Sequence, residues 1–232
     1  MDRTSRIDWA EVTAQLDAHG YAVTAPVVSA ADCRELVAGF DDESRYRSVV
    51  DMSRHRFGSG VYKYFAAPLP PLVADLRERL YAGLAPIANE WVARLGGDEH
   101  FPPALGEFLD RCHAAGQSRP TPLVFRYGEG DHNRLHQDVY GGVRFPLQVV
   151  TALDRPDVDF TGGEFLLVTQ PPRAQSLGEA IRTERGRLVI FPNARRPMTG
   201  ARGWYGANVR HGVSPVRSGT RHTLGVIFHD AA

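Results

Sequence analysis

Cysteine is nearly absent from this chain of 232 residues, with Cys33 and Cys112 the only two. Two cysteines are too few for a framework of disulfides, and Met1-Asp2-Arg3-Thr4 lacks the apolar segment of a secretory signal peptide. No uninterrupted apolar run approaches the roughly 18 residues that a membrane-spanning helix needs. We therefore expect a protein of the reducing cytoplasm that has no membrane partner.

An excess of charge of either sign is also missing. Lys and Arg together number 27, as do Asp and Glu, so the formal net charge is zero. No global positive field draws the chain to nucleic acid, and such binding would depend on a local basic patch. Hydrophobic residues make up 43% of the chain and charged residues 23%, values that are ordinary for a folded protein and exclude wholesale disorder.

The first half of the chain is patterned as helices. Apolar residues at helical spacing predict helices over about 8–18, 29–37, 72–95 and 104–114, and a short strand is expected over 21–28. Asp8 is the expected N-cap of the first helix, and Gly20 is expected to close it. Pro86 is expected to divide or kink the third helix, because proline removes a helical hydrogen bond.

The second half is patterned as strands. From residue 121 on, short β-rich runs alternate with turn residues, at 123–127, 135–139, 145–153, 163–169, 187–191, 208–213 and 223–229. With a short return strand this makes about eight strands, the number in a double-sheet jelly roll. We predict a mainly β fold with flanking helices (α+β) and one catalytic domain over 1–232. Residues 121–232 would form the barrel, and 1–120 would supply helices packed outside it and a basic lid segment.

The side chains with the clearest chemistry are His136 and Asp138. They lie two residues apart in the run 135–139, so on a strand both would point to the same face. His211, in another β-patterned run, is the best candidate for a third ligand. Two histidines and one carboxylate form the facial triad of non-haem Fe(II) oxygenases, whereas zinc sites more often use cysteine or three histidines. A lone His-X-Asp tripeptide is more often part of a solvated loop, and the order of the surrounding motifs favours the metal site.

Those motifs follow one another along the chain as Arg126-Tyr127-Gly128-Glu129-Gly130, His136-Gln137-Asp138, Thr161-Gly162-Gly163-Glu164-Phe165, Leu188-Val189-Ile190-Phe191-Pro192, Arg210-His211-Gly212-Val213 and Arg221-His222-Thr223-Leu224. On these residues the chain resembles the 2-oxoglutarate/Fe(II)-dependent dioxygenases of the prolyl 4-hydroxylase and AlkB-like type. It resembles most closely a bacterial family whose members are taken, by fold analogy, to act on damaged nucleic acid. The segment Gly60-Val61-Tyr62-Lys63-Tyr64-Phe65 also resembles that family. The resemblance implies a double-stranded β-helix that uses Fe(II), 2-oxoglutarate and O2, hydroxylates a substrate C–H and releases succinate and CO2.

Arg221, ten residues after His211, is the expected anchor for the distal carboxylate of 2-oxoglutarate, because a guanidinium matches a carboxylate with two parallel hydrogen bonds. The resemblance implies that Tyr127 hydrogen-bonds the same carboxylate, and Thr223 and Gln148 are expected to contact the cosubstrate. A surface charge and a core tyrosine are the simpler alternatives for Arg221 and Tyr127.

The departures from the two family patterns concern the substrate. AlkB-like enzymes carry asparagine at the positions of Phe125 and Thr223 and a second arginine at that of Ile227, so the site looks more like a prolyl hydroxylase. Against the prolyl hydroxylase pattern an inward tyrosine is missing at Ala152, and Gln148 is expected to fill part of its role.

Segment 45–64 is basic and aromatic, and Arg54, Arg56 and Lys63 are its candidate phosphate contacts. The segment is expected to be either a lid that holds phosphate and stacks a base or a solvated edge. Arg202 and Trp204, which precede His211, are placed near the barrel mouth as further substrate contacts, with packing as the alternative for Trp204.

Four functions are consistent with these residues. The first is oxidative demethylation of a damaged base in nucleic acid, with single-stranded or damaged nucleic acid as the partner. The others are hydroxylation of a protein or peptide residue, hydroxylation of a small molecule and, in a different class, a non-catalytic jelly-roll binding module.

Overall fold

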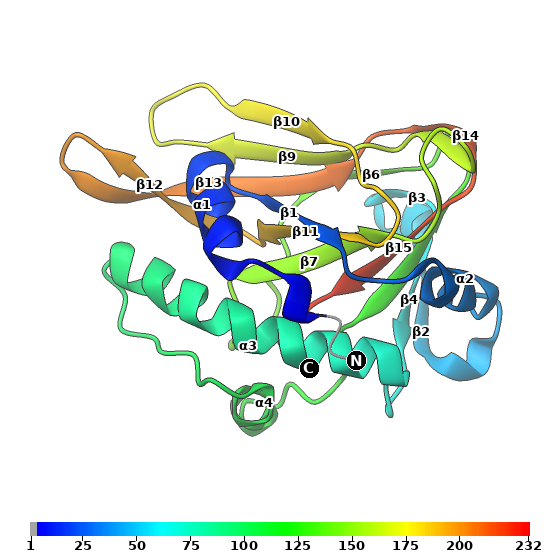
Figure 1. Cartoon of the computed structure of the whole chain (residues 1–232), viewed down its shortest axis with the longest axis horizontal. Helices are drawn as coiled ribbons and strands as arrows, with labels where there is room; N and C mark the ends of the chain where they lie inside the picture. The colour runs from blue at the N-terminus through cyan, green and yellow to red at the C-terminus, as the bar shows by residue number, and fades with distance from the viewer. Residues whose placement is uncertain (1–3) are drawn as a thin grey trace.

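Two facing β-sheets with helices on one outer side make up the computed structural model, which describes residues 4–232 (Figure 1). Within these residues the larger sheet has seven strands, in the spatial order β1 (Ala22–Pro26), β11 (Arg187–Pro192), β7 (Leu147–Ala152), β15 (Arg221–Val226), β5 (Leu123–Tyr127), β4 (Val61–Phe65) and β2 (Tyr46–Asp51). The facing sheet consists of β10 (Leu177–Ile181), β9 (Phe165–Gln170), β13 (Gly203–Val213), β6 (His132–His136) and β3 (Gly58–Ser59), with β12 (Arg195–Gly200) paired to β13. Strands β8 (Phe160–Gly162) and β14 (Val216–Gly219) form a separate pair.

The helices are α1 (Trp9–His19), α2 (Ala30–Ala38), α3 (Pro71–Arg94) and α4 (Leu105–Ala114), with short 3-10 turns η1 (Thr4–Arg6), η2 (Glu43–Arg45) and η3 (Met52–His55). Asp8 caps α1 by accepting hydrogen bonds from two backbone amides, and Gly20 ends it with a φ of 84°, as predicted. The expectation that Pro86 divides the third helix is wrong, because α3 continues through it from Pro71 to Arg94. Packing along a whole helix face outweighs the loss of one hydrogen bond.

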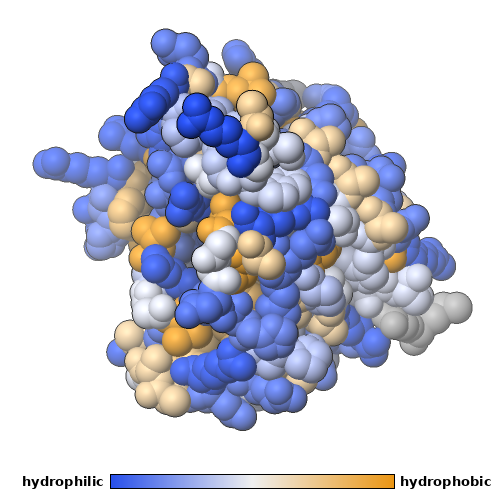
Figure 2. Space-filling model, turned by 90° about the vertical axis from the view of Figure 1, so that its left-hand side faces the viewer, coloured by the Kyte–Doolittle hydropathy of each residue, from blue (hydrophilic) through white to orange (hydrophobic). Residues whose placement is uncertain are grey.

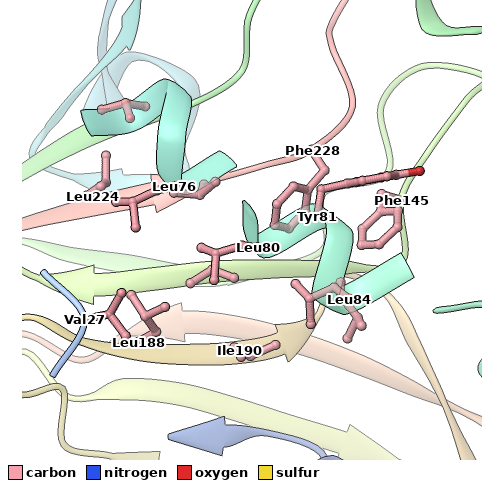
Figure 3. Close-up of a cluster of buried hydrophobic side chains, with 14 of the residues drawn as sticks. Val27, Leu76, Leu80, Tyr81, Leu84, Phe145, Leu188, Ile190, Leu224 and Phe228 are labelled. Carbon is pink, nitrogen blue, oxygen red and sulfur yellow. The ribbon is translucent and has the colours of Figure 1, made fainter. Parts of the chain in front are cut away.

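The main core lies between α3 and the outer face of the larger sheet. Leu76, Leu80 and Leu84 recur at helical spacing along α3 and meet Leu188 and Ile190 of β11 (Figure 3). All five side chains are buried, and each contributes roughly 1.5–3 kcal/mol through removal of apolar area from water. This packing leaves the opposite, inner face of the same sheet free to line a cavity.

The predicted α+β class, with a jelly-roll barrel and helices outside it, is confirmed by this arrangement. Every pairing between the named strands of the two large sheets is antiparallel, and α3 covers the larger sheet from outside (Figure 1). Segment 45–64, expected as a lid or an edge, forms the hairpin of β2 and β4 at the edge of the larger sheet, while β3 pairs with β6 of the other. This segment therefore bridges the two sheets at one end of the barrel.

Candidate functional site

A cavity of about 460 Å³ lies between the two sheets. The larger sheet contributes β4, β5, β7 and β15 to its walls, and the facing sheet contributes β6 and β13. The hairpin that bridges the sheets adds Met52, Arg56 and Phe57 at the edge. All three residues of the expected metal triad line this cavity, as does Arg221.

The triad residues converge although they come from separate segments. Possible ligand atoms of His136, Asp138 and His211 lie within 4.8 Å of one another. His211 Nε2 is 3.3 Å from one carboxylate oxygen of Asp138, and His136 Nε2 is 3.7 Å from the other. His136 Nδ1 lies 2.7 Å from the Arg134 carbonyl, so a hydrogen on Nδ1 leaves the Nε2 lone pair directed at the cluster. Two imidazoles and one carboxylate match Fe(II) in donor type and number.

The prediction that His136 and Asp138 share a strand is wrong. Strand β6 runs from His132 to His136, and Asp138 lies in the loop beyond it. The Gln137 side chain donates to the Ala194 and Val209 carbonyls, both at 2.8 Å, and so fixes this loop to the end of the facing sheet. Asp138 reaches the cluster because the loop is held, and not through strand alternation.

A β-bulge sets the direction of His136. On β13, His211 pairs with His136 and Val213 with Asn133, so three steps along β6 oppose two along β13. Asn133 and His136 therefore both line the cavity as half-buried residues, while Arg134 and Leu135 between them are exposed at its edge. The backbones approach so closely that a Cβ on Gly212 would lie 2.6 Å from the Asn133 carbonyl oxygen. Glycine beside His211 is thus required by the bulge that aims His136.

The electrostatics of the cluster favour the protonation states that bind a metal ion. Burial by itself raises the pKa of Asp138, but the hydrogen bond and charge of His211, the charge of His136 and the Gln148 amide together lower it below its usual value. Burial, followed by the charge of His211, lowers the pKa of His136. An ionised carboxylate and neutral imidazoles are the forms that bind a divalent cation. Gln148 lines the cavity and donates to Asp138 at 2.9 Å, which holds the expected metal carboxylate in place, and its contact with the cosubstrate stays a prediction.

Arg221 lies at the other end of the cavity and is fully buried. Its Nη atoms meet only the hydroxyls of Thr223 and Thr183, at 3.4 and 3.3 Å, and within residues 4–232 its Nε has no hydrogen-bond partner. Burial lowers the pKa of Arg221 to about 10. Tyr127, its partner across β5 and β15, has a raised pKa for the same reason. A buried guanidinium without an acidic partner is costly alone and is suited to a carboxylate ligand.

Several residues of this site were not predicted from the sequence. Thr183 comes from the loop after β10 and contacts Arg221. Tyr62, Tyr64 and Tyr140 line the cavity on the side of the metal cluster. The two-residue spacing of Tyr62 and Tyr64 was a readable signal, since alternate strand residues share a face, whereas Thr183 had none.

The predicted substrate residues are in different places. Arg56 lines the cavity edge, and Arg54 is mostly exposed and ion-paired with Asp51. Lys63 does not reach the surface, because its Nζ is buried and donates to the Phe40 carbonyl at 2.9 Å. Its expected role as a phosphate contact is therefore wrong.

Arg202 and Trp204 are also wrongly placed by the prediction. They lie on the hairpin of β12 and β13, which projects from the barrel at the end where α3 finishes (Figure 1). Neither lines the cavity, and the Trp204 ring lies 4.3 Å from the guanidinium of Arg94 on α3. This end of the molecule is mainly hydrophilic, with hydrophobic surface in small separate areas (Figure 2).

Comparison with known sequences settles the family. Residues 60–231 match a family of oxygenases described as catalysing oxidative methylation of damaged DNA. The chain belongs to this oxygenase family. Two uncharacterised proteins, from two strains of Mycobacterium tuberculosis, are each 50% identical to it over 168 residues, which is 72% of this chain and 72% of each relative.

Solved structures with the same fold are hydroxylases and oxygenases. A prolyl-4-hydroxylase from Pseudomonas putida superposes with a TM-score of 0.56 at 17% identity, over 97% of this chain and 99% of that one. A Trichoplax adhaerens prolyl hydroxylase in complex with a hypoxia inducible factor peptide gives 0.60 at 14%, over 96% and 89%. A 2OG-Fe(II) oxygenase family protein from Burkholderia pseudomallei gives 0.54 at 18%, over 97% and 93%.

The family identifies the chain as an oxygenase, an oxidoreductase. The His-Asp-His cluster provides a potential iron site. Across residues 4–232, none of the helices combines the length and apolar character needed to traverse a membrane.

Proposed function

We propose that this oxygenase hydroxylates alkyl groups on damaged bases in nucleic acid. His136, Asp138 and His211 hold Fe(II), and Arg221, Tyr127 and Thr223 hold 2-oxoglutarate. Bound together with O2, these cofactors supply C–H oxidation with release of succinate and CO2. The observation that carries the proposal is a single cavity that contains the His-Asp-His cluster and, at its far end, a buried guanidinium without an acidic partner.

The chain's own residues position the reactants. Gln148 holds one oxygen of Asp138, and the Arg134 carbonyl fixes the His136 ring, so the three ligands stay on one face of the cluster. Arg221 orients the cosubstrate by its distal carboxylate. Apolar side chains such as Phe165 and Phe191, which line the cavity beside His211, exclude water from the reacting groups.

The substrate class is supported by the residues at the cavity edge, which we call the mouth patch: Arg56, Phe57, Arg134 and Leu135. Phe57 is 47% exposed and Leu135 40%, and the Arg134 amide donates to the Phe57 carbonyl at 2.8 Å, so the hairpin and the bulge are joined. Neither arginine is ion-paired within residues 4–232. Free guanidiniums beside an exposed aromatic ring suit phosphates and an unstacked base.

A second candidate is hydroxylation of a peptide residue. It is favoured by Phe125, Thr223 and Ile227, which stand where AlkB-like enzymes carry two asparagines and an arginine.

Two free, buried cysteines are consistent with the proposal that the protein works in a reducing cytoplasm.

The test is succinate formation with a panel of substrates in the presence of Fe(II) and 2-oxoglutarate. The panel contains single-stranded oligonucleotides with N-methylated bases, the same oligonucleotides without methylation, and proline-containing peptides. We expect succinate above the substrate-free rate only with methylated oligonucleotides, together with loss of the methyl group by mass spectrometry. Stimulation by peptides alone would replace this proposal with the second candidate.

A further inference from the structure

Three tyrosines gather in the cavity beside the metal cluster. Tyr62 and Tyr64 lie two apart on β4, with ring centroids 5.4 Å apart and planes at 85°. Tyr140 comes from the loop that carries Asp138. All three tyrosines line the cavity that contains Asp138, and Tyr140 follows Asp138 by two residues.

Strand register places this group away from the anion end. Across β15 and β5 Arg221 pairs with Tyr127 and Gly225 with Leu123, and Leu123 pairs with Tyr64 on β4. Tyr64 is thus four residues along the sheet from Arg221, a distance of roughly 13 Å at about 3.3 Å per residue. The cavity therefore has an anion end at Arg221 and a hydroxyl end at Tyr64 and Tyr140.

The hydroxyl end has unused hydrogen-bonding capacity. The Tyr140 hydroxyl is buried and lies close to the Tyr64 hydroxyl, so that a weak hydrogen bond between them affects the pKa of both, but it has no partner of good hydrogen-bond geometry within residues 4–232. Arg47 lies 4.5 Å from the centroid of the Tyr64 ring and holds it in place, with its Nε donating to the Pro120 carbonyl. Phenol hydroxyls are protonated at neutral pH, so both can act as hydrogen-bond donors. Buried polar groups are nearly always hydrogen-bonded, so an exception that lines a cavity can bond to an atom of a bound ligand.

We propose that the hydroxyls of Tyr64 and Tyr140 donate hydrogen bonds to a carbonyl oxygen on the edge of the damaged base, and so select bases that carry one. This inference rests on the proposed function. A neutral donor pair suits a neutral acceptor, and the neighbouring Tyr62 and Phe125 rings, with centroids 5.4 Å apart and planes tilted by 55°, give the cavity aromatic surface against which a planar ligand can pack. Methylated bases with a carbonyl, such as 3-methylcytosine and 3-methylthymine, would then be preferred over 1-methyladenine, which has none.

The test compares Tyr64→Phe, Tyr140→Phe and wild type on single-stranded oligonucleotides that carry each of these three bases. Removal of one neutral hydrogen bond should lower kcat/KM for the two carbonyl bases by about three- to tenfold, mainly through KM. The effect on 1-methyladenine should be less than about twofold, and since it is cationic like 3-methylcytosine, the pair controls for substrate charge. Tyr205→Phe, on the β12–β13 hairpin outside the cavity, is the matched control and should behave as wild type.

Two further readouts separate a recognition role from a structural one. Bound metal, measured after Fe(II) loading, and the melting temperature should match wild type in both variants. Equal losses on all three bases, or no loss on any, would overturn the inference while leaving the proposed function intact. If wild type oxidises none of the three bases, the proposed function fails and this inference fails with it.

Discussion

Arg221 offers the sharpest test of the site, because its burial without an acidic partner has two opposite consequences. Burial lowers its pKa from the ordinary value of a guanidinium to about 10, which at 1.36 kcal/mol per pH unit corresponds to about 3 kcal/mol of uncompensated desolvation. Replacement by the similarly long and apolar methionine removes this cost. We therefore expect Arg221→Met to melt at a higher temperature than wild type when cosubstrate is absent, by up to roughly 6–12 °C at ~2–4 °C per kcal/mol.

Addition of 2-oxoglutarate should stabilise wild type more than the variant. At a cosubstrate concentration of about 100 Kd, wild type gains ~2.7 kcal/mol, or roughly 5–11 °C. Loss of a charge-assisted contact of about 1.5–3 kcal/mol weakens binding about 10- to 150-fold and leaves a gain of only ~0.3–1.4 kcal/mol in the variant.

The assay is thermal melting with Mn(II) in place of Fe(II), with and without 2-oxoglutarate, supported by calorimetric titration of the cosubstrate. Arg210→Met is the matched control, since Arg210 is exposed on β13 next to His211 and should give the wild-type shift. Wild-type affinity for 2-oxoglutarate in Arg221→Met would refute the assignment of the anion end.

Three further predictions follow from other parts of the structure. His136→Ala, Asp138→Ala and His211→Ala should each abolish Fe(II) binding in a metal titration while circular dichroism stays unchanged, and retained binding would remove that residue from the triad. Gly212→Ala should lower the free energy of unfolding by about 1–3 kcal/mol and weaken Fe(II) binding, because its Cβ would meet the β6 bulge; Gly106→Ala, which has nothing within 4 Å, should do neither. Burial lowers the pKa of His229 to about 4, so between pH 4 and about 6.5 the unfolded chain binds a proton that the folded chain does not. The free energy of unfolding should therefore rise with pH across this window, by up to ~3 kcal/mol more in wild type than in His229→Gln. Denaturation measured at several pH values checks this, and the same pH dependence in both proteins would contradict it.

The chemistry of this protein was readable from its sequence because it depends on residue types in a fixed order. His136, Asp138 and His211 were identified by type and spacing, and the structure brings them within 4.8 Å of one another. The strand pattern after residue 121 predicted the barrel, since period-two alternation directly reflects burial on one face. Arg221 was identified by its position ten residues after His211 in the sequence, and its burial fits the expected role of a carboxylate anchor.

Side-chain directions were decided by the tertiary structure alone. Alternation along β6 holds only up to a bulge whose presence depends on the fit of Gly212 against the neighbouring backbone. Lys63 turns to the Phe40 carbonyl because β4 is an edge-side strand with a core beneath it, and no local pattern encodes which of its faces is covered.

The same limit applies to contacts between distant segments. Trp204 lies against Arg94 of α3, 110 positions earlier, and Tyr140 meets Tyr64 only because a loop of one sheet closes over an edge of the other. Local sequence fixes which residues share an element, since backbone geometry sets the repeat. Which elements face one another depends on the burial of apolar surface over the whole chain. The packing that results brings the anion end, the hydroxyl end and the mouth patch together around one metal cluster.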